Sequence, residues 1–257
     1  MNNIKALIVI FNKSLLDSFT FNSIKALHGI DIIIADNSTK DFGNESYAKE
    51  AGCQYISMQG NKGLSKAYNK VISTLEKNDD LLCLFDDDSS VGEDYFSKLR
   101  EAAQVHKDID LFAPIVKDDV GILSPCIIHG VKVMRIKDTQ NLPANNISLI
   151  NSGLTIRMKV FENYQYDEKQ FLDYIDHAFV RDIINNHSAK VYIMEDVMIK
   201  QCFSGSEKSS WTADKERFKI FKKDISYFCK RFSISKWDKE MLLLRRRVSL
   251  LTKHLSK

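Results

Sequence analysis

Three adjacent aspartates, Asp86-Asp87-Asp88, directly follow the apolar run Leu81 to Phe85, and they are the strongest chemical signal in the chain. The apolar run is typical of a buried strand. Alternate side chains of an extended chain point to the same side, so Asp86 and Asp88 are expected to lie together. Carboxylates held together repel each other unless a cation lies between them, and Mg²⁺ or Mn²⁺ prefers such oxygen ligands. The triplet therefore predicts a divalent metal site suited to a leaving diphosphate, although acids after a strand also cap helices or solvate turns.

Polar residues also follow three other predicted strands, at the point where each strand ends. These residues are Asn12, Asp36-Asn37-Ser38 and Gln59-Gly60-Asn61. Ligands of parallel α/β sheets bind at the carboxyl ends of the strands, so all four strand ends are expected to form one site. Asp, Asn and Ser are common turn formers, so the second of these segments would by itself be interpreted as a plain loop.

The segment from Asn61 to Asn69 combines small residues with amides at a predicted helix start. Gly63 and Ala67 are four residues apart and would leave a small-residue groove, with Asn61 and Asn69 at its edges. A helix N-terminus with small side chains lets a ligand approach the backbone. An ordinary turn that leads into an amphipathic helix explains the segment equally well.

The elements that must position these residues alternate between strand and helix in the first half of the chain. Apolar runs predict strands at 4–11, 30–35, 55–57, 81–85 and 109–115, and helical spacing predicts helices at 14–28, 47–52, 64–75 and 95–105. This alternation predicts an α/β fold with a mostly parallel sheet covered on both faces. The rhythm is lost from residue 121, where we expect mixed or antiparallel strands at 125–136 and 147–158, a helix at 171–185, short strands at 191–194 and 197–202, and two helices after 211.

Composition places the chain among ordinary globular proteins. Its 257 residues are 44% hydrophobic and 28% charged, which fits one large domain or one domain with an appendage. The five cysteines form no C-x-x-C pair, and no signal peptide or apolar stretch of membrane-spanning length is evident. We therefore expect a reducing, cytoplasmic location, either in solution or peripheral on the inner face of the cell membrane.

Charge divides the chain into an acidic body and a basic tail. Residues 211–257 carry 14 Lys/Arg and 5 Asp/Glu, whereas residues 1–210 carry 23 basic and 29 acidic groups. The tail also contains many apolar residues, so it is either a packing helix pair with a solvated basic face or a pair attracted to an anionic membrane. It has no recognised nucleic-acid motif, and we expect no nucleic-acid partner.

In their order and spacing, these motifs resemble family 2 of the inverting glycosyltransferases, which have the GT-A fold, and especially its bacterial rhamnosyltransferase-like members. The matching segments are Phe11-Asn12, Asp36-Asn37-Ser38, Asn61 to Asn69, Asp86 to Ser89, Asn151-Ser152-Gly153 and Phe171 to Asp176. The resemblance spans about residues 4–205. It implies a catalytic domain at 1–210 and a helical tail at 211–257. Within the domain it implies a nucleotide-sugar-binding half at 1–115 and an acceptor-binding half at 116–210.

The resemblance also implies a role for each matching residue. Asp86 and Asp88 would hold Mg²⁺ or Mn²⁺, and Asp176 would be the general base, with Asp173 as the alternative. The donor pocket would be formed by Asn12, Asp36, Asn37, Asn61, Gly63, Asn69 and Asp87, and the acceptor side by Ser152 and Gly153. The donor would be a dTDP-, UDP- or GDP-linked sugar, and the resemblance favours dTDP-rhamnose among these. The acceptor would be a glycan, which the tail suggests is lipid-diphosphate-linked.

Two positions depart from the family pattern. Many members carry a His-x-x-Gly segment near the end of the catalytic domain, whereas Lys200 to Gly205 has no His and Gln201 stands in that place. The family's arginine usually lies six residues after the base, whereas Arg181 lies five residues after Asp176. Other function classes stay open, namely a nucleotidyltransferase, or a non-catalytic carbohydrate-binding subunit. A nucleotidyltransferase is expected to have a glycine-rich loop after the first strand, whereas the segment at that place, Asn12-Lys13-Ser14, contains no glycine.

Overall fold

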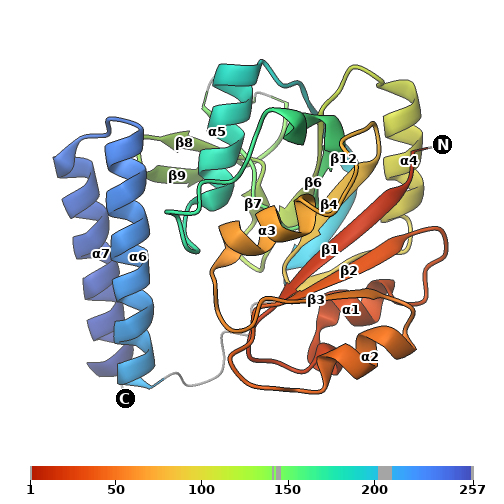
Figure 1. Ribbon diagram of the computed structural model, residues 1–257. Helices are drawn as coiled ribbons and strands as arrows, with labels where there is room; N and C mark the ends of the chain where they lie inside the picture. Colours follow the sequence, from red (N-terminus) through yellow and green to blue (C-terminus); the bar gives the residue numbers. More distant parts are fainter. Residues whose placement is uncertain (1, 141, 143–145, 202–209, 256–257) are drawn as a thin grey trace.

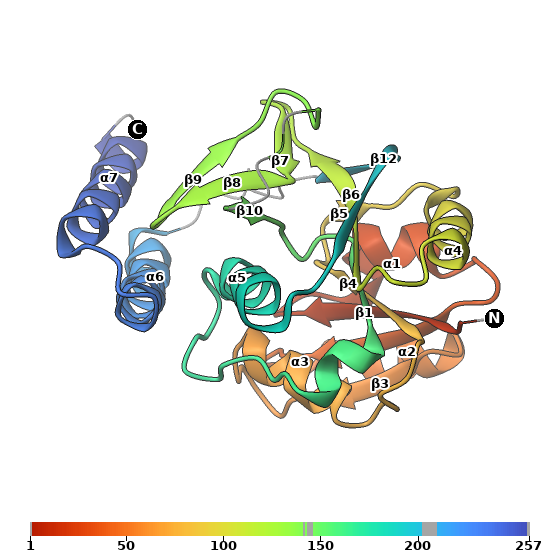
Figure 2. The same ribbon diagram turned by 90° about the horizontal axis from the view of Figure 1, so that it is seen from above.

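The computed structural model describes residues 2–140, 142, 146–201 and 210–255. A large mixed sheet forms its centre, with strand order β3-β2-β1-β4-β11-β6-β12-β5 and β7 paired to β6. A small sheet of order β10-β8-β9 lies beside it, and the helices α6 and α7 form the outer edge (Figures 1 and 2). The expected α/β architecture with a mixed second half is confirmed.

The element bounds follow the sequence closely in the first half. The large sheet consists of β1 (Ile4–Ile10), β2 (Asp31–Asp36), β3 (Gln54–Ser57), β4 (Leu81–Phe85), β5 (Ser89–Ser90), β6 (Leu111–Lys117), β7 (Ile122–Ser124), β11 (Leu154–Arg157) and β12 (Val191–Gln201). The small sheet consists of β8 (Cys126–His129), β9 (Lys132–Arg135) and β10 (Ile147–Ser148). The helices are η1 (Leu15–Asp17), α1 (Phe19–Ile24), α2 (Asn44–Glu50), α3 (Leu64–Ile72), α4 (Tyr95–Val105), η2 (Met158–Glu162), α5 (Ile175–His187), α6 (Trp211–Arg231) and α7 (Lys236–Leu255).

Strands β1 to β4 are parallel, and their carboxyl ends meet at one edge of the sheet. Strands β1, β2 and β4 are buried on both faces, since apolar clusters cover both sides of the sheet, whereas β3 at the sheet edge is partly exposed. This explains why β1 and β4 read as nearly continuous apolar runs. Strand β11 enters antiparallel between β4 and β6, which places the residues just before it next to the end of β4.

Several sequence-based element predictions were wrong in detail. The strands expected at 125–136 and 147–158 are each divided in two, into β8 and β9 and into β10 and β11. The helix expected at 14–28 is divided into η1 and α1, because Ser14 and Ser18 each cap a separate start. The two strands expected at 191–202 are one strand, β12, with a register shift between Met194 and Met198. The helix expected to begin at 171 begins at Ile175, because the chain before it is held in an irregular conformation by α6.

The basic tail packs against the body of the protein. Phe221, Ile225 and Phe228 of α6 form a third apolar cluster with Ala178 of α5 and Ile128 of β8. Within the described residues no helix is long and apolar enough to cross a membrane. The free cysteines are Cys53, Cys83, Cys126 and Cys229, and Cys202 lies outside the described residues.

Candidate functional site

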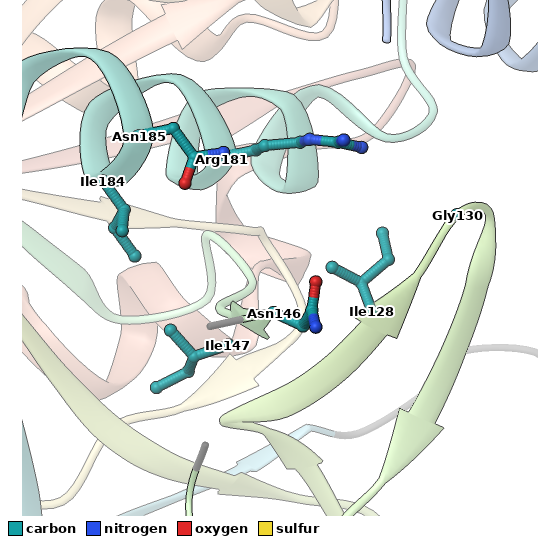
Figure 3. A pocket seen from close by; sticks show the side chains of 7 residues that line it. All are labelled: Ile128, Gly130, Asn146, Ile147, Arg181, Ile184 and Asn185. Carbon is teal, nitrogen blue, oxygen red and sulfur yellow. The ribbon is translucent and has the colours of Figure 1, made fainter. Parts of the chain in front are cut away.

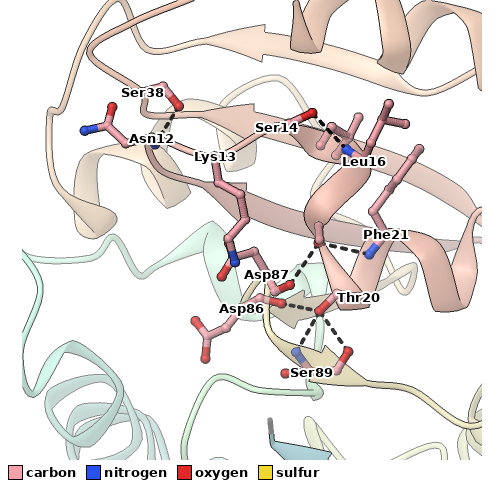
Figure 4. Close-up of polar contacts among 12 residues, drawn as sticks. Asn12, Lys13, Ser14, Leu16, Thr20, Phe21, Ser38, Asp86, Asp87 and Ser89 are labelled. Carbon is pink, nitrogen blue, oxygen red and sulfur yellow. Dashed lines mark hydrogen bonds and ion pairs between the residues drawn. The ribbon is translucent and has the colours of Figure 1, made fainter. Parts of the chain in front are cut away.

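The backbone of the aspartate triplet is held in place by the start of α1. The Ser18 hydroxyl donates to the carbonyl of Asp87 at 3.0 Å. The Thr20 hydroxyl lies within hydrogen-bonding distance of the Asp86 and Ser89 carbonyls and accepts from the Ser89 N–H at 3.0 Å (Figure 4). The turn after β4 is therefore rigid, and its three carboxylates project from a fixed frame.

Asp86 is surrounded by other acidic side chains. Its Oδ2 atom accepts a 2.5 Å hydrogen bond from Ser152, which stands just before β11. Loss of hydration is the main cause that raises the pKa of Asp86 to about 6, and the charges of Asp88 and Asp176 raise it further, against the effect of Ser152. Ionised Asp86 therefore carries unbalanced negative charge, which is the condition that a bound cation relieves.

The other two acids of the triplet have different partners. Asp87 forms a 2.6 Å ion pair with Lys13, which follows β1. Asp88 accepts a hydrogen bond from Gln201 at the end of β12, and its buried Oδ1 atom has no hydrogen-bond partner among the described residues. Burial raises the pKa of Asp88, and the charge of Asp87 adds to this. Gln201 therefore stands beside the expected metal ligand, in the place where the family pattern has a histidine.

Asp176 lies in the first turn of α5 and faces the triplet closely enough to raise the pKa of Asp86. Its Oδ1 atom accepts from the N–H of His177 at 2.7 Å. The His177 ring is buried, and its Nδ1 atom is 2.7 Å from the Ser148 hydroxyl, so the side chain is a core residue of α5. The Asp176 carboxylate is thus anchored by one oxygen at the helix start.

Asp173 has a different environment, although it is only three residues away. Both of its oxygens accept from Arg217 of α6, at 2.5 and 2.6 Å. Its own N–H donates to Asp224, whose fully buried carboxylate also accepts the N–H groups of Phe171 and Leu172 at 2.9 and 2.8 Å. The tail therefore fixes the chain that leads into Asp176.

The part of the site that was expected to bind the nucleotide contains Asp36 at the end of β2. Its Oδ1 atom accepts from the Ser38 N–H at 2.9 Å, and Oδ2 accepts from Asn44 at 2.8 Å and Tyr55 at 3.1 Å. Burial, with the nearby Asp36 charge, raises the pKa of Tyr55, so the phenol stays a donor. An open cleft of about 590 Å³ lies beside Asp36, lined also by Ser57, Gln59 and Gly60. Most of the residues that line the cleft are polar or charged.

The Asn61 to Asn69 segment makes close backbone contacts that require its small residues. The Asn37 side chain accepts from the N–H of Lys62 at 2.8 Å, and the Asn61 side chain accepts from Gly63 at 3.1 Å. Gly63 has a φ of 87°, and a Cβ there would lie 2.6 Å from the Phe171 ring. The glycine thus lets the start of α3 meet the chain that precedes Asp176.

Two residues of the expected donor pocket have their side chains committed elsewhere. The Asn69 amide donates to the Tyr166 carbonyl at 2.9 Å and accepts from the Tyr166 N–H at 3.0 Å. Asn12 is exposed, and its Oδ1 atom accepts from the N–H and hydroxyl of Thr39 at 2.8 and 3.0 Å. Asn12 therefore ties the end of β1 to the loop after β2, whereas Asn69 holds the loop around Tyr166.

Ser152 and Gly153 lie where β11 meets the triplet. Gly153 has a φ of 80°, its N–H donates to the Leu84 carbonyl at 2.7 Å, and a side chain there would collide with Ile199 of β12. The neighbouring Asn151 donates to the buried hydroxyl of Tyr68 at 3.2 Å. This glycine lets Ser152 approach Asp86.

Arg181 lies away from the triplet. It lines a pocket of about 160 Å³ between α5 and the β8–β9 hairpin, together with Asn146 and Asn185 (Figure 3). Its guanidinium group also stacks on the Phe232 ring, with 4.5 Å between the guanidinium carbon and the ring centroid. The structure therefore places Arg181 between α5 and the tail.

Sequence reasoning missed several residues that shape the site. Lys13 and Thr20 give no signal along the chain, because they become important only when β1 and α1 fold against the end of β4. Asp224 is likewise an ordinary acid in a basic segment until α6 packs on the body. Within the described residues no group of three or more His, Cys, Asp or Glu side chains is arranged to hold a metal ion. A bound cation would therefore need oxygens from its ligand and from water.

Comparisons with known proteins identify the family and the fold. The model of the family described as glycosyl transferase family 2 matches residues 6–165, more than half of the chain. Comparison with curated protein sequences found no match.

Solved structures share the fold at low sequence identity. S. aureus TarS, residues 1–349, aligns with a TM-score of 0.58 and 12% identity over 98% of this chain and 72% of that one. The mannosyltransferase PcManGT from Pyrobaculum calidifontis, in complex with GDP-Man and Mn²⁺, aligns with a TM-score of 0.58 and 10% identity over 98% and 73% of the two chains. Glucosyl-3-phosphoglycerate synthase from Mycobacterium tuberculosis, in complex with Mn²⁺, UDP-Glc and phosphoglyceric acid, aligns with a TM-score of 0.54 and 12% identity over 88% and 80%. The family match and the shared GT-A fold show that the chain belongs to glycosyl transferase family 2.

Proposed function

We propose that this glycosyltransferase moves a sugar from a nucleoside diphosphate donor to a hydroxyl of a growing, lipid-linked bacterial surface glycan, with inversion. The observation that carries the proposal is the convergence of Asp86, Asp88 and Asp176 at the carboxyl edge of a family 2 sheet. The cluster thus contains two carboxylates that can bind a cation and a third carboxylate that can accept a proton. An inverting displacement needs one base on the face opposite the leaving group, and a second acidic helper is unnecessary.

The cleft beside Asp36 is the proposed place of the nucleotide base. Asp36 is the buried acceptor at its wall, and the Tyr55 and Asn44 side chains hold it in one orientation. Two similar structures contain GDP-Man or UDP-Glc, which supports a nucleotide-sugar donor here. The sugar is proposed to be rhamnose or another hexose, carried on dTDP, UDP or GDP.

The acidic cluster fits Mg²⁺ or Mn²⁺, which prefer oxygen ligands. The buried Asp88 Oδ1 atom without a hydrogen-bond partner is the expected signature of a missing ligand, and Asp86 is crowded by like charges. Asp86 and Asp88 would hold the ion, and Gln201 would orient Asp88 through its hydrogen bond. When bound, the ion supplies Lewis-acid neutralisation of the departing diphosphate. Lys13 is near enough to add a positive charge, through its pair with Asp87.

Asp176 is the proposed general base for the acceptor hydroxyl. It faces the triplet and has one oxygen anchored by its own helix, which leaves the other for an acceptor. Asp173 is less suited to this role, because both of its oxygens are engaged by Arg217. Its proposed role is to fix the approach to Asp176.

The decisive experiment measures nucleoside diphosphate release from dTDP-, UDP- and GDP-sugars with a sugar acceptor, in Mg²⁺, Mn²⁺ or EDTA. One donor is expected to give metal-dependent release, and Asp88→Ala is expected to lower it at least 10²-fold, because the leaving diphosphate loses its counter-ion. Asp108→Ala is the matched control and is expected to keep full activity, because Asp108 is exposed and pairs with Lys190 before the start of β6 and β12, at the opposite end of the strands. Metal-dependent nucleotide binding without release would favour a non-catalytic carbohydrate-binding subunit. Release of pyrophosphate from a nucleoside triphosphate would favour a nucleotidyltransferase.

The tail is proposed to bring the enzyme to an anionic membrane surface at the inner face of the cell membrane. Four lysines of α6 are exposed beside its packed faces: Lys215, Lys219, Lys222 and Lys223. Lys219 lies four residues after Lys215, and Lys222 and Lys223 lie three and four residues after Lys219, which places all four on one side of the helix. A row of this kind is attracted to anionic lipid headgroups, and salt weakens the attraction.

Reversal of these charges is expected to abolish sedimentation with anionic vesicles. The test variant is Lys219→Glu/Lys222→Glu/Lys223→Glu, and the control reverses three exposed lysines elsewhere, Lys25→Glu/Lys49→Glu/Lys107→Glu. Deletion of the tail is a poor test, because α6 is part of the folded core. Equal sedimentation of wild type and both variants would contradict the membrane role of this face.

A further inference from the structure

The outer face of α7 carries a continuous row of exposed apolar side chains. Trp237 is 72% exposed and Leu244 is 55% exposed, and the complete row is Trp237, Met241, Leu244, Val248 and Leu251. Successive members are four and three residues apart, so they lie along one side of the helix over about 20 Å. We refer to these five residues as the α7 seam.

The opposite side of α7 already has its partner. Leu243 is buried in the cluster formed with α6, and Arg246 and Arg247 stack over the rings of Phe221 and Phe218. Helix α7 forms the outermost layer of the molecule in both views, with α6 between it and α5 (Figures 1 and 2). Over Leu244, Val248 and Leu251 the α7 seam therefore faces away from the rest of the chain. At its other end, Trp237 and Met241 also line a cavity of about 250 Å³ with the β8–β9 hairpin and remain exposed beside it.

The pattern of the seam fits another helix better than a lipid surface. A strict alternation of four and three residues makes a narrow stripe, as in coiled coils, whereas a helix that lies in a membrane presents a wider apolar face. The flanks carry both signs of charge, with Asp238 and Glu240 near one end and Arg245 beyond them. Acidic residues next to the seam disfavour anionic lipid but suit pairing with a second chain.

Self-pairing would bring opposite charges of the two chains together, in addition to the 3.1 Å pair that Glu240 forms with Lys239 of its own chain. In a parallel pair of α7 helices, Glu240 of one chain lies near Arg245 of the other, because flanking residues five apart meet across the seam of a coiled coil. Two symmetric ion pairs result. The five seam residues expose roughly 600 Å² in each chain, so two copies would bury roughly 1,200 Å², the lower end of the range for stable interfaces.

We propose that the protein forms a homodimer in which the α7 seams of two copies pack against each other in parallel. The two α6–α7 pairs then form a four-helix unit at the centre of the dimer, and the two catalytic sites lie on its outer sides. This inference does not depend on the proposed transfer reaction, because it concerns a face far from Asp86 and Asp176.

Sedimentation velocity on the full chain tests the proposal. Wild type is expected at about twice the 29.5 kDa chain mass, and Leu244→Glu is expected at the chain mass with an unchanged far-ultraviolet circular dichroism spectrum. Ser249→Glu, on the exposed part of α7 outside the seam, is the control and is expected to remain dimeric. Val248→Glu repeats the test if Leu244→Glu alters the fold.

A charge exchange tests the parallel arrangement, and lipid binding tests the rival occupant. Glu240→Arg is expected to weaken self-association severalfold, and the double variant Glu240→Arg/Arg245→Glu is expected to restore it.

A monomeric wild type at high micromolar concentration would overturn the proposal. So would a monomer that sediments with phosphatidylglycerol vesicles and loses this property in Leu244→Glu, because the seam would then be a lipid-binding face. No restoration in the double variant would overturn the parallel register.

Discussion

Asp176→Asn is expected to lower the rate of sugar transfer by about 10³-fold, because a positioned general base contributes roughly 10² to 10⁴ to such reactions. The amide has almost the same shape as the carboxylate and keeps an acceptor for the His177 N–H, so the start of α5 should not move. Metal-dependent binding of the nucleoside diphosphate should remain, since Asp86 and Asp88 are intact. The measurement is a comparison of kcat for transfer with the affinity for the nucleotide, determined by calorimetry.

Asp173→Asn is the matched comparison for this prediction. It removes one charge three residues away and weakens the bidentate ion pair with Arg217, which is partly exposed. The expected result is a modest loss of stability and a much smaller loss of kcat. The opposite order of the two effects, with Asp173→Asn inactive and Asp176→Asn active, would transfer the role of base to Asp173.

Asp224→Ala is expected to destabilise the protein by about 3–5 kcal/mol, because three backbone N–H groups lose a buried, charged acceptor. The carboxylate is fully buried and accepts from Phe171, Leu172 and Asp173 at 2.8 to 2.9 Å. Transfer activity should fall as well, since these residues lead directly into Asp176. Urea unfolding followed by circular dichroism measures the free energy of unfolding.

The neighbouring exposed lysine provides the control for this effect. Lys223→Ala is expected to change the free energy of unfolding by less than about 0.5 kcal/mol. Asp224→Asn keeps one side-chain acceptor and should give an intermediate loss. A change below about 1 kcal/mol in Asp224→Ala would show that α6 does not support the approach to Asp176.

The sequence alone was sufficient for the fold class and for the edge of the sheet that carries the site. Buried parallel strands must be apolar on both faces, so β1 and β4 are visible as apolar runs, and the polar residues that end them mark the carboxyl edge. Asp36 and the Asp86 to Asp88 triplet were identified in this way. The order of these motifs along the chain indicated glycosyltransferase family 2, and the match to the family model confirms this family assignment.

The partners of these residues depended on contacts between distant parts of the chain. Ser152 reaches Asp86 only because β11 enters the sheet antiparallel beside β4, and no local pattern encodes that crossing. Asp173 and Asp176 are equivalent by helical spacing, and the placement of Arg217 on α6 separates them. The sequence allowed the basic tail to be either a packing helix pair or a membrane-binding one. The structure shows that α6 packs on α5 and β8 and that its Asp224 accepts backbone hydrogen bonds from the segment before α5. Periodicity reports which face of a helix is apolar, whereas the identity of what covers that face is decided by tertiary packing.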